Sequence, residues 1–475
     1  MRLTVLPLAA TMVALAACSD SPVQPSPARA ASATAAVSAA RPNRMVVEFN
    51  GGVRDDFAAR VTALGGTVNF VADGAGFAGV SGLTADAAAS LGRQSGISAV
   101  YDDVPVQLGA STRGNDMLAA NASVTSIANP ATAVGFAFQW NMRAINAPAA
   151  WAAGHLGSPN VTAAILDTGI DYDSYDMNSM VDLARSKSFV PSDDALLGAF
   201  FPARNKIDDL NGHGTNVSTQ VSSNATVFAG VNSRTRLIGV KIFGFDGSGS
   251  VAAILAGIVW AADHGADVAN LSFGIPGGVD KAGNGRFLGL TNRVFNYANR
   301  AGMVVVVAAG NDGENLDNNG RSFSAYCEAG HVICVSATGP TASGNPFSGP
   351  FANVDAPADY SNTGLKSIAV SAPGGTAAGL VSSVCARHLL AVSGSSIVFP
   401  CDLPPGFFFA LGAAGTSEAA PHVTGVVAQL IAKYGAKNPT KIKQLLLNGV
   451  DDLGPPGPDA AYGAGRVNLL KALSQ

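Results

Sequence analysis

The chain has 475 residues and, with 29 Lys and Arg against 33 Asp and Glu, a formal charge of −4. This mild acidity, with only 13% charged residues, argues against nucleic acid or an anionic membrane surface as the main partner. Apolar residues make up 48% of the chain, which excludes wholesale disorder and permits a large core.

The first residues have the composition of an export signal. Arg2 supplies a positive start, residues 3–17 are apolar, and the run ends in Leu15-Ala16-Ala17-Cys18. This ending resembles a bacterial lipobox, whose Cys is acylated; the alternative is an ordinary signal peptide cleaved near Ala17. We therefore predict a lipoprotein-type signal peptide at 1–17, a precursor anchored to the membrane through Cys18, and a mature protein that is extracellular or periplasmic.

Two segments of low complexity flank a small folded unit. Residues 18–43, rich in Ala, Ser and Pro, predict a flexible tether, and the small and polar residues 109–137 predict a linker. Between them, at 44–108, we expect strands and helices in the order β-α-β-β-α-β, which is the ferredoxin-like α+β arrangement. The expected strands are 45–49, 67–71, 77–80 and 97–101, and the expected helices are 55–64 and 84–91.

Residues 138–475 alternate apolar runs with helical stretches. The apolar runs are 161–166, 237–243, 268–271, 303–309, 332–337 and 367–371, and the expected helices are 251–263, 417–433 and 440–448. This alternation predicts an α/β fold with a central parallel sheet and helices on both faces.

Four cysteines remain after Cys18, in the close pairs Cys327/Cys334 and Cys385/Cys401. An even count in an exported chain predicts disulfide bonds. Three pairings are possible, and we favour bonds between sequence neighbours. A zinc site is the alternative, but neither pair has the short spacing usual for zinc.

Three segments each place a reactive side chain at the end of an apolar element. They are Asp167-Thr168-Gly169, Gly212-His213-Gly214-Thr215 and Gly415-Thr416-Ser417. A carboxylate at a strand end needs a hydrogen-bond donor, flanking glycines leave His213 accessible, and free N–H groups near Ser417 can bind a developing negative charge. Each segment alone is commonly a turn, a loop or a helix cap.

Together the three segments resemble the motifs of the subtilisin-like serine proteases, the subtilase family, in that family's order Asp, His, Ser. The resemblance covers 138–475, and residues 44–108 are similar to the family's inhibitory propeptide. It implies a subtilisin-like three-layer fold and a secreted serine endopeptidase, made as a zymogen that processes itself within 109–137. The implied partners are polypeptide substrates and the chain's own propeptide, with no nucleic acid.

The resemblance also implies a role for each site residue. Ser417 is the nucleophile, His213 the general base, Asp167 the residue that orients it, and Asn311 the side-chain donor to the oxyanion. The implied substrate-binding residues are Leu271, Ser272, Phe273 and Gly274 on one side and Gly247, Ser248 and Gly249 on the other. We expect broad cleavage after apolar or aromatic residues.

The chemistry needs no cofactor, although the family often binds structural calcium in surface loops. The stretch 222–226 is shorter than the family's usual calcium loop. Asp171, Asp173 and Asp176 are candidates to hold a cation, but of the two alternatives we favour a solvated acidic loop. His422, inside the helix motif, is expected to be a packed structural residue.

Two rival functions differ in their sequence requirements. An α/β-hydrolase esterase carries its Ser in G-x-S-x-G ahead of the acid and the His, whereas Ser417 comes last. A catalytically silent relative that only binds peptides would not need the complete set of Asp167, His213, Ser417 and Asn311.

Overall fold

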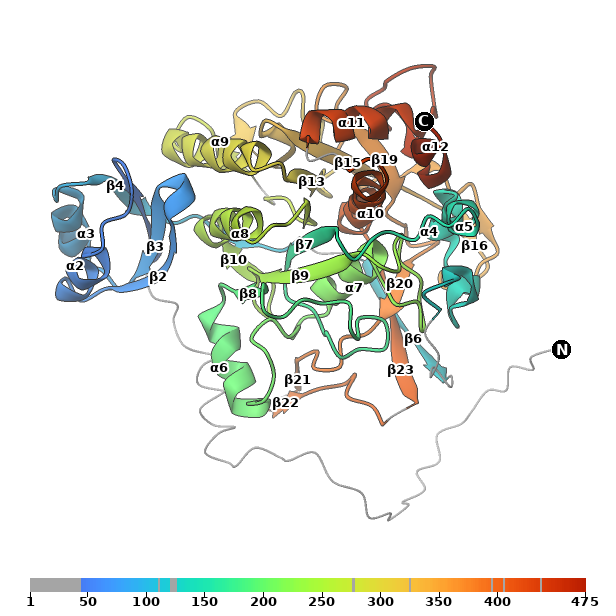
Figure 1. Cartoon of the computed structure of the whole chain (residues 1–475), viewed down its shortest axis with the longest axis horizontal. Coiled ribbons are helices and arrows are strands. Elements are labelled where there is room, and N and C mark those ends of the chain that lie inside the picture. Colours follow the sequence, from blue (N-terminus) through green and yellow to red (C-terminus); the bar gives the residue numbers. More distant parts are fainter. Residues whose placement is uncertain are drawn as a thin grey trace, which may run out of the picture.

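The computed structural model describes residues 44–109, 112–119, 126–275, 278–323, 326–393, 396–404, 406–435 and 438–475. The predicted signal peptide, Cys18 and the tether lie outside these residues. The described chain forms a small N-terminal unit beside a larger α/β unit (Figure 1). In the part of the chain that is described, no helix has both the length and the apolar character of a membrane span.

The N-terminal unit has the predicted order of elements: β1 (Arg44–Phe49), α2 (Phe57–Ala63), β2 (Thr67–Ala72), β3 (Phe77–Ser81), α3 (Ala85–Gly92) and β4 (Ile97–Asp102). The strands form an antiparallel sheet in the order β2-β3-β1-β4. Because strand side chains alternate, Val47 packs with Phe57 and Leu91 under the two helices. Val46 and Phe77 point the other way and belong to the core of the larger unit.

The larger unit is built on a mostly parallel sheet in the order β24-β25-β19-β15-β13-β11-β7-β9-β8, with β18 paired to β15. The apolar runs predicted as strands all contribute to it. The strands are β7 (Thr162–Asp167), β8 (Lys187–Ser188), β9 (Arg236–Lys241), β11 (Val268–Leu271), β13 (Val304–Ala308), β15 (Val332–Gly339), β18 (Ala356–Pro357), β19 (Val370–Pro373), β24 (Val450–Asp451) and β25 (Arg466–Val467).

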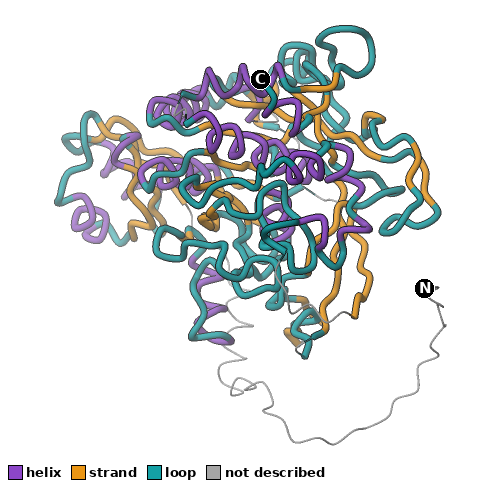
Figure 2. The backbone as a smooth tube through the Cα atoms, turned by 45° about the vertical axis from the view of Figure 1, so that its right-hand side comes forward, coloured by secondary structure: helices purple, strands orange, loops and turns teal. Residues whose placement is uncertain are grey.

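Helices cover both faces of this sheet, giving three layers (Figures 1 and 2). Ala164 and Leu166 of β7 pack in the core under α8 (Val251–Asp263) and α9 (Gly285–Arg300). Ala163 and Ile165 face the opposite core. That core contains α5 (Ala147–Ala152), α7 (His213–Val221), α10 (Thr416–Tyr434), α11 (Pro439–Asn448) and α12 (Leu469–Leu473).

A second sheet of three antiparallel strands lies beside the ends of α7 and α10, in the order β20-β23-β6. Its strands are β20 (Val381–Val384), β23 (Phe407–Ala414) and β6 (Thr112–Ala119). β6 falls within the segment predicted as an irregular linker. β6 pairs with β23 over eight residues, from Thr112 to Ala119, and this long-range pairing is not visible in the local sequence.

Several short elements were not predicted from the sequence. They are β5 (Pro105–Gln107), α4 (Trp140–Ala144), α6 (Pro191–Phe200), β10 (Ser248–Ser250), β12 (Val279–Asp280), β14 (Ser322–Phe323), β16 (Ala342–Ser343), β17 (Phe351–Ala352), β21 (Ala391–Ser393) and β22 (Ser396–Val398), with 3₁₀ turns at Asp73–Ala75, Pro130–Thr132, Phe136–Phe138 and Tyr326–Glu328. The two disulfides join Cys327 to Cys334 and Cys385 to Cys401, the sequence neighbours we favoured.

Candidate active site

Asp167 and His213 meet at the carboxyl end of the parallel sheet. β7 ends at Asp167, and α7 begins at His213 after Gly212, whose φ of +93° is readily adopted only by Gly. Nδ1 of His213 lies 2.7 Å from Oδ1 of Asp167, and the N–H of Thr168 donates to the same oxygen at 2.8 Å. Because a carboxylate only accepts, Nδ1 carries the proton and Nε2 is the basic nitrogen of the neutral ring.

Ser417 is the second residue of α10, which packs against α7. Its Oγ donates to the backbone oxygen of Ser272 at 2.8 Å, and Oγ of Ser272 donates to the backbone oxygen of Ser417 at 2.7 Å. The structure therefore joins the predicted nucleophile directly to the segment 271–274, which the sequence predicted to bind substrate.

Asn311 follows β13 and lies against the start of α10. The N–H and Oγ of Thr416 both donate to Oδ1 of Asn311, at 2.9 and 2.8 Å. Nδ2 of Asn311 lies only 3.1 Å from the point where a side chain on Gly415 would begin. With its oxygen held by Thr416, the amide presents its N–H₂ group as the donor beside the residues that precede Ser417.

The segment around Gly249, which we predicted to bind substrate, is paired with another strand of the same chain. β10 pairs antiparallel with β5, with Gly249 opposite Val106. The N–H of Leu108 donates to the oxygen of Gly247 at 2.7 Å, and the Gln107 amide donates to the oxygen of Asp246, also at 2.7 Å. Residues 105–108 thus lie along one predicted substrate-binding edge.

β6 approaches the same site. β23 runs directly into Gly415 and Ser417, and Thr112, the first residue of β6, lies opposite Ala414. Four Cα–Cα steps separate Leu108 from Thr112, a reach of at most about 14 Å. The chain therefore passes within four residue steps from the edge of β10, at Leu108, to a position opposite Ala414, three residues before Ser417.

The side chain of Phe273 belongs to the core. It contacts Phe243 and Tyr326 edge-on, with ring centroids 4.9 and 5.8 Å apart. The other predicted substrate-binding residues offer mostly backbone groups, as expected of strands that pair with an extended peptide.

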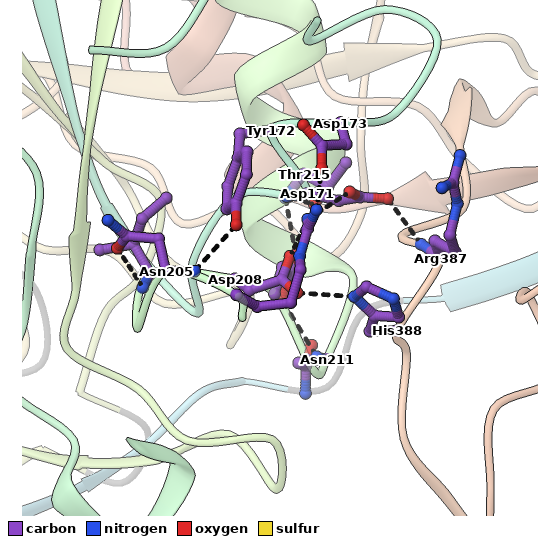
Figure 3. Close-up of polar contacts among 12 residues, drawn as sticks. Asp171, Tyr172, Asp173, Asn205, Asp208, Asn211, Thr215, Arg387 and His388 are labelled. Carbon is purple, nitrogen blue, oxygen red and sulfur yellow. Dashed lines mark hydrogen bonds and ion pairs between the residues drawn. The ribbon is translucent and has the colours of Figure 1, made fainter. Parts of the chain in front are cut away.

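The acidic residues proposed for a cation are bonded within the protein (Figure 3). Asp171 accepts from the N–H of Arg387 at 2.7 Å and from Arg204, which also pairs with Asp173. Asp208 binds Arg204 at 2.8 Å and His388 at 2.6 Å. Burial, followed by the nearby Asp208, raises the pKa of Asp171 to about 6.

Asp176 is bonded to the backbone. It accepts from the N–H groups of Val227 and Phe228, at 2.7 and 3.1 Å. Asp171 and Asp176 are completely buried, so the alternative of a solvated acidic loop is wrong for these two residues. Among the described residues no group of three or more His, Cys, Asp and Glu is arranged to hold a metal. The oxygens of Asp171 and Asp176 already accept hydrogen bonds from backbone N–H groups, and Asp171 also pairs with Arg204, so this arrangement does not fit a bound cation. We therefore assign no calcium ion to it.

His422 is fully buried in α10, as expected of a packed structural residue. Its Nδ1 lies 2.7 Å from the oxygen of Glu418, and Nε2 lies 2.8 Å from Nδ2 of Asn141. The Glu418 oxygen can only accept, so Nδ1 carries the proton and Nε2 accepts from Asn141. Burial lowers the pKa of His422 to about 4.

This lowered pKa predicts a loss of stability in acid. Below pH 6.5, His422 is protonated in the unfolded chain, whereas in the native protein it stays neutral down to about pH 4 because its pKa is lowered. The free energy of unfolding therefore falls as the pH drops towards 4. The contribution lost is about 3 kcal/mol. Unfolding in urea at pH 7 and 4.5, in a Ser417→Ala background that prevents autolysis, should show a smaller pH dependence for His422→Gln than for the parent. The exposed His331→Asn is the control, and equal pH dependence in His422→Gln and the parent would refute the assignment.

The sequence missed the functional positions that depend on long-range pairing. We did not predict β5 or β6 from the sequence. The buried Asp209 and Thr168, which lie in or next to the predicted motifs, were assigned no role. The sequence positions of Asp209, four residues before His213, and of Thr168, directly after Asp167, were the one indication that these residues lie near the site.

Comparison with known proteins places this geometry in a family. A sequence model described as "Subtilase family" matches residues 158–465. The chain is 30% identical over 321 residues to the thermophilic serine proteinase of Bacillus sp. (strain AK1), covering 67% of this chain but only 63% of that protein. It is 28% identical over 330 residues to subtilisin DY of Bacillus licheniformis, covering 69% of this chain and 96% of the relative.

Solved structures share the fold. The epidermin leader peptide processing serine protease of Staphylococcus aureus matches with a TM-score of 0.66 at 21% identity, over 92% of this chain and 98% of that one. Fervidolysin of Fervidobacterium pennivorans, a keratinolytic enzyme related to subtilisin, matches with a TM-score of 0.61 at 24% identity, over 92% of this chain and 61% of that one.

Proposed function

The chain belongs to the subtilase family of serine proteases, and from this premise we propose that it is a secreted endopeptidase made as a self-processed zymogen. Asp167, His213 and Ser417 form its catalytic triad. The observation that carries the proposal is the 2.7 Å contact between Nδ1 of His213 and Asp167, which leaves Nε2 as the base next to α10. The fold and the family make the protein a peptide hydrolase.

The reaction follows from these groups. Ser417 Oγ exchanges its hydrogen bond to Ser272 for one to Nε2 of His213, which takes the proton as Oγ attacks the peptide carbonyl. Asp167 stabilises the imidazolium. The oxyanion accepts from Nδ2 of Asn311 and from the backbone N–H of Ser417. His213 then protonates the leaving amine, and water hydrolyses the acyl-enzyme by the same steps.

The substrate enters as an extended strand. The backbone groups of Gly247, Ser248 and Gly249 bind it along one edge, and Leu271, Ser272, Phe273 and Gly274 line the other. In the precursor, residues 105–108 lie along the segment proposed to bind the substrate, and β6 begins opposite Ala414, three residues before Ser417. We therefore place the processing cut among the bonds joining Leu108 to Thr112. The unit at 44–108 then acts as an inhibitory propeptide that remains bound after the cut.

Charged and capping contacts support this inhibitory role. Arg293 of α9 pairs with Glu48 at 2.5 Å and donates to the oxygen of Ala75 at 3.0 Å. Asp103 accepts from the N–H of Ala252, in the first turn of α8, at 2.9 Å. The propeptide thus supplies an anion to a helix N-terminus, a favourable position for negative charge.

Removing Arg293 should weaken the bound propeptide. Arg293→Ala leaves Glu48, which is largely buried, without its cation, so we expect about tenfold weaker binding after the cut. The measurement is the activity regained when the purified, processed complex is diluted. Arg300→Ala, an exposed Arg on the same helix, is the matched control. Equal release from Arg293→Ala and the parent would exclude this contact as a determinant of inhibition.

The location of the enzyme follows from the order of its parts. A lipid on Cys18 and the tether 18–43 would hold the precursor at the membrane. A cut beyond Leu108 would break the covalent link between the catalytic domain and that anchor, and dissociation of the bound propeptide would complete the separation. The mature protease would then be released outside the cytoplasmic membrane.

Covalent labelling tests the proposed function. A fluorophosphonate should modify Ser417 in the folded, processed protein and leave heat-unfolded protein unlabelled, because only the assembled triad activates Oγ. Mass spectrometry of the labelled peptide locates the adduct. A folded protein that binds peptides but does not react would be the silent relative, and the proposal would fail.

A further inference from the structure

A buried carboxylate that takes no part in the proposed chemistry lies between the two catalytic loops. Asp209 is completely buried. Its Oδ1 accepts from Oγ of Thr168 and from the N–H groups of Asn211 and Gly212, each at 2.9 Å. Its Oδ2 accepts from the N–H and Oγ of Thr215, at 2.9 and 2.7 Å. One side chain therefore binds residues on both sides of His213 and the residue after Asp167.

Thr168 completes the connection between the loops. Its hydroxyl donates to Asp209 and accepts from the N–H of Gly214 at 2.9 Å, while its backbone N–H holds the Asp167 carboxylate. The loops are in direct contact here, since a Cβ on Gly214 would lie 2.0 Å from the oxygen of Gly169. Two of the partners of Asp209, Thr215 and Asn211, appear in Figure 3 beside Asp171 and His388.

We propose that Asp209 is a positioning residue for catalysis, which acts through the hydroxyl of Thr168 to hold Asp167 and His213 at hydrogen-bonding distance. This inference rests on the proposed triad. Asp209 touches no reacting atom, but each of its bonds ends within two residues of Asp167 or His213. Because misplacing a reacting group by about 1 Å costs on the order of 10²-fold in rate, this set of bonds should affect turnover strongly.

The chemistry of the site explains the choice of a carboxylate. Asp209 accepts five hydrogen bonds, and a carboxylate donates none. In Asp209→Asn one of the two carboxylate oxygens is replaced by an N–H₂ group, which cannot accept from the backbone N–H groups that donate to Asp209. Asp209→Asn is therefore a disruptive change despite its equal size.

The decisive test compares Thr168→Val with Thr168→Ser, because only the latter keeps the bridging hydroxyl. In the processed enzyme, with active sites counted by fluorophosphonate, Thr168→Val should lower kcat by roughly 10- to 100-fold with KM changed less than about twofold. Thr168→Ser should remain within about threefold of the parent, and Asp209→Asn should lose on the order of 10²-fold in kcat. The low-field proton resonance of His213 Nδ1–H should weaken or shift in Thr168→Val and persist in Thr168→Ser.

A matched control separates positioning from stability. Asp176→Asn alters another buried carboxylate with backbone N–H partners, away from both catalytic loops, so it should change the unfolding temperature but not kcat or the resonance. A Thr168→Val enzyme with parental kcat and resonance would overturn the proposal, whether or not Asp209→Asn folds. A parent that neither labels nor cleaves would instead refute the proposed function, while the resonance would still test the role of Asp209.

Discussion

Replacing Ser417 with Ala should abolish proteolysis and leave the chain uncut between Leu108 and Thr112. No other group is proposed to attack the peptide carbonyl, so the loss in kcat should be on the order of 10⁶-fold, the size known for triad removal in subtilisin. Self-processing should stop with it, because β5 and β6 bring the chain's own backbone past the same nucleophile.

The measurement is mass spectrometry of the purified proteins, which reports the N-terminus directly. The parent should begin between residues 109 and 112, whereas Ser417→Ala should retain the 44–108 unit in the same polypeptide. Ser336→Ala is a suitable control, because Ser336 is also buried but bonds to Ala461 away from the site. Normal processing of isolated Ser417→Ala, with no other protease present, would exclude cleavage by its own active site.

The same pair of proteins tests the membrane anchor at Cys18. If the precursor is acylated there, Ser417→Ala should stay in the membrane fraction, whereas the processed parent should appear in the soluble fraction once dilution has released it from its propeptide. Cys18→Ser should remove the difference. A mature parental domain that remains in the membrane fraction would contradict release by processing.

The sheet could be predicted from the sequence because parallel strands are buried on both faces. Val304–Ala308, for example, is a continuous stretch of Val and Ala, and this strand lies within one residue of its predicted bounds, 303–309, whereas β19 begins three residues after the predicted start at 367. The N-terminal unit was equally visible, since Gly and Thr residues mark the ends of its helices. Thr84, for example, caps α3 by accepting from the N–H of Ala87.

The strands that bring the chain to its own active site left no such pattern. β5 alternates, with Val106 buried between the exposed Pro105 and Gln107, but three residues are too few to identify a strand from the sequence. β6 pairs with β23 along the edge of the three-stranded sheet, and no apolar run marks it in the sequence. The prediction of a linker at 109–137 therefore missed strand β6. The apolar cluster formed by α6 and the disulfide-closed segment 385–401, which includes Leu197 and Leu390, was likewise invisible because its partners are far apart in sequence.

The same limit applied to the polar residues of the site. The motifs identified Asp167, His213 and Ser417 by their local sequences. The partners of the buried carboxylates, such as Arg387 for Asp171 and Thr168 for Asp209, lie 216 and 41 residues away. From the sequence we expected the acidic residues at 171–176 to be solvated. In the structure Asp171 and Asp176 are buried and accept hydrogen bonds from N–H groups of distant segments.

Asn311 carries the second large expected effect. Its Oδ1 accepts from both donors of Thr416, which leaves Nδ2, near Gly415, as the group that we propose donates to the oxyanion. Asn311→Ala should lower kcat by roughly 10²–10³, because the transition state loses a preorganised donor that the neutral carbonyl of the substrate hardly uses. KM should therefore change little, which a peptide-anilide assay on processed enzyme would measure.

Two further variants separate the donor from the support that Oδ1 gives to α10. Asn311→Asp keeps the acceptor for Thr416 but places a negative charge beside the developing oxyanion, so it should be at least as slow as Asn311→Ala. Thr416→Ser keeps both bonds to Oδ1 and should retain activity within about threefold. If Asn311→Ala raised KM and left kcat unchanged, Asn311 would bind the substrate and the transition state equally. In that case the oxyanion would depend on the backbone N–H of Ser417 and other donors, and the amide of Asn311 would serve only to hold the first turn of α10.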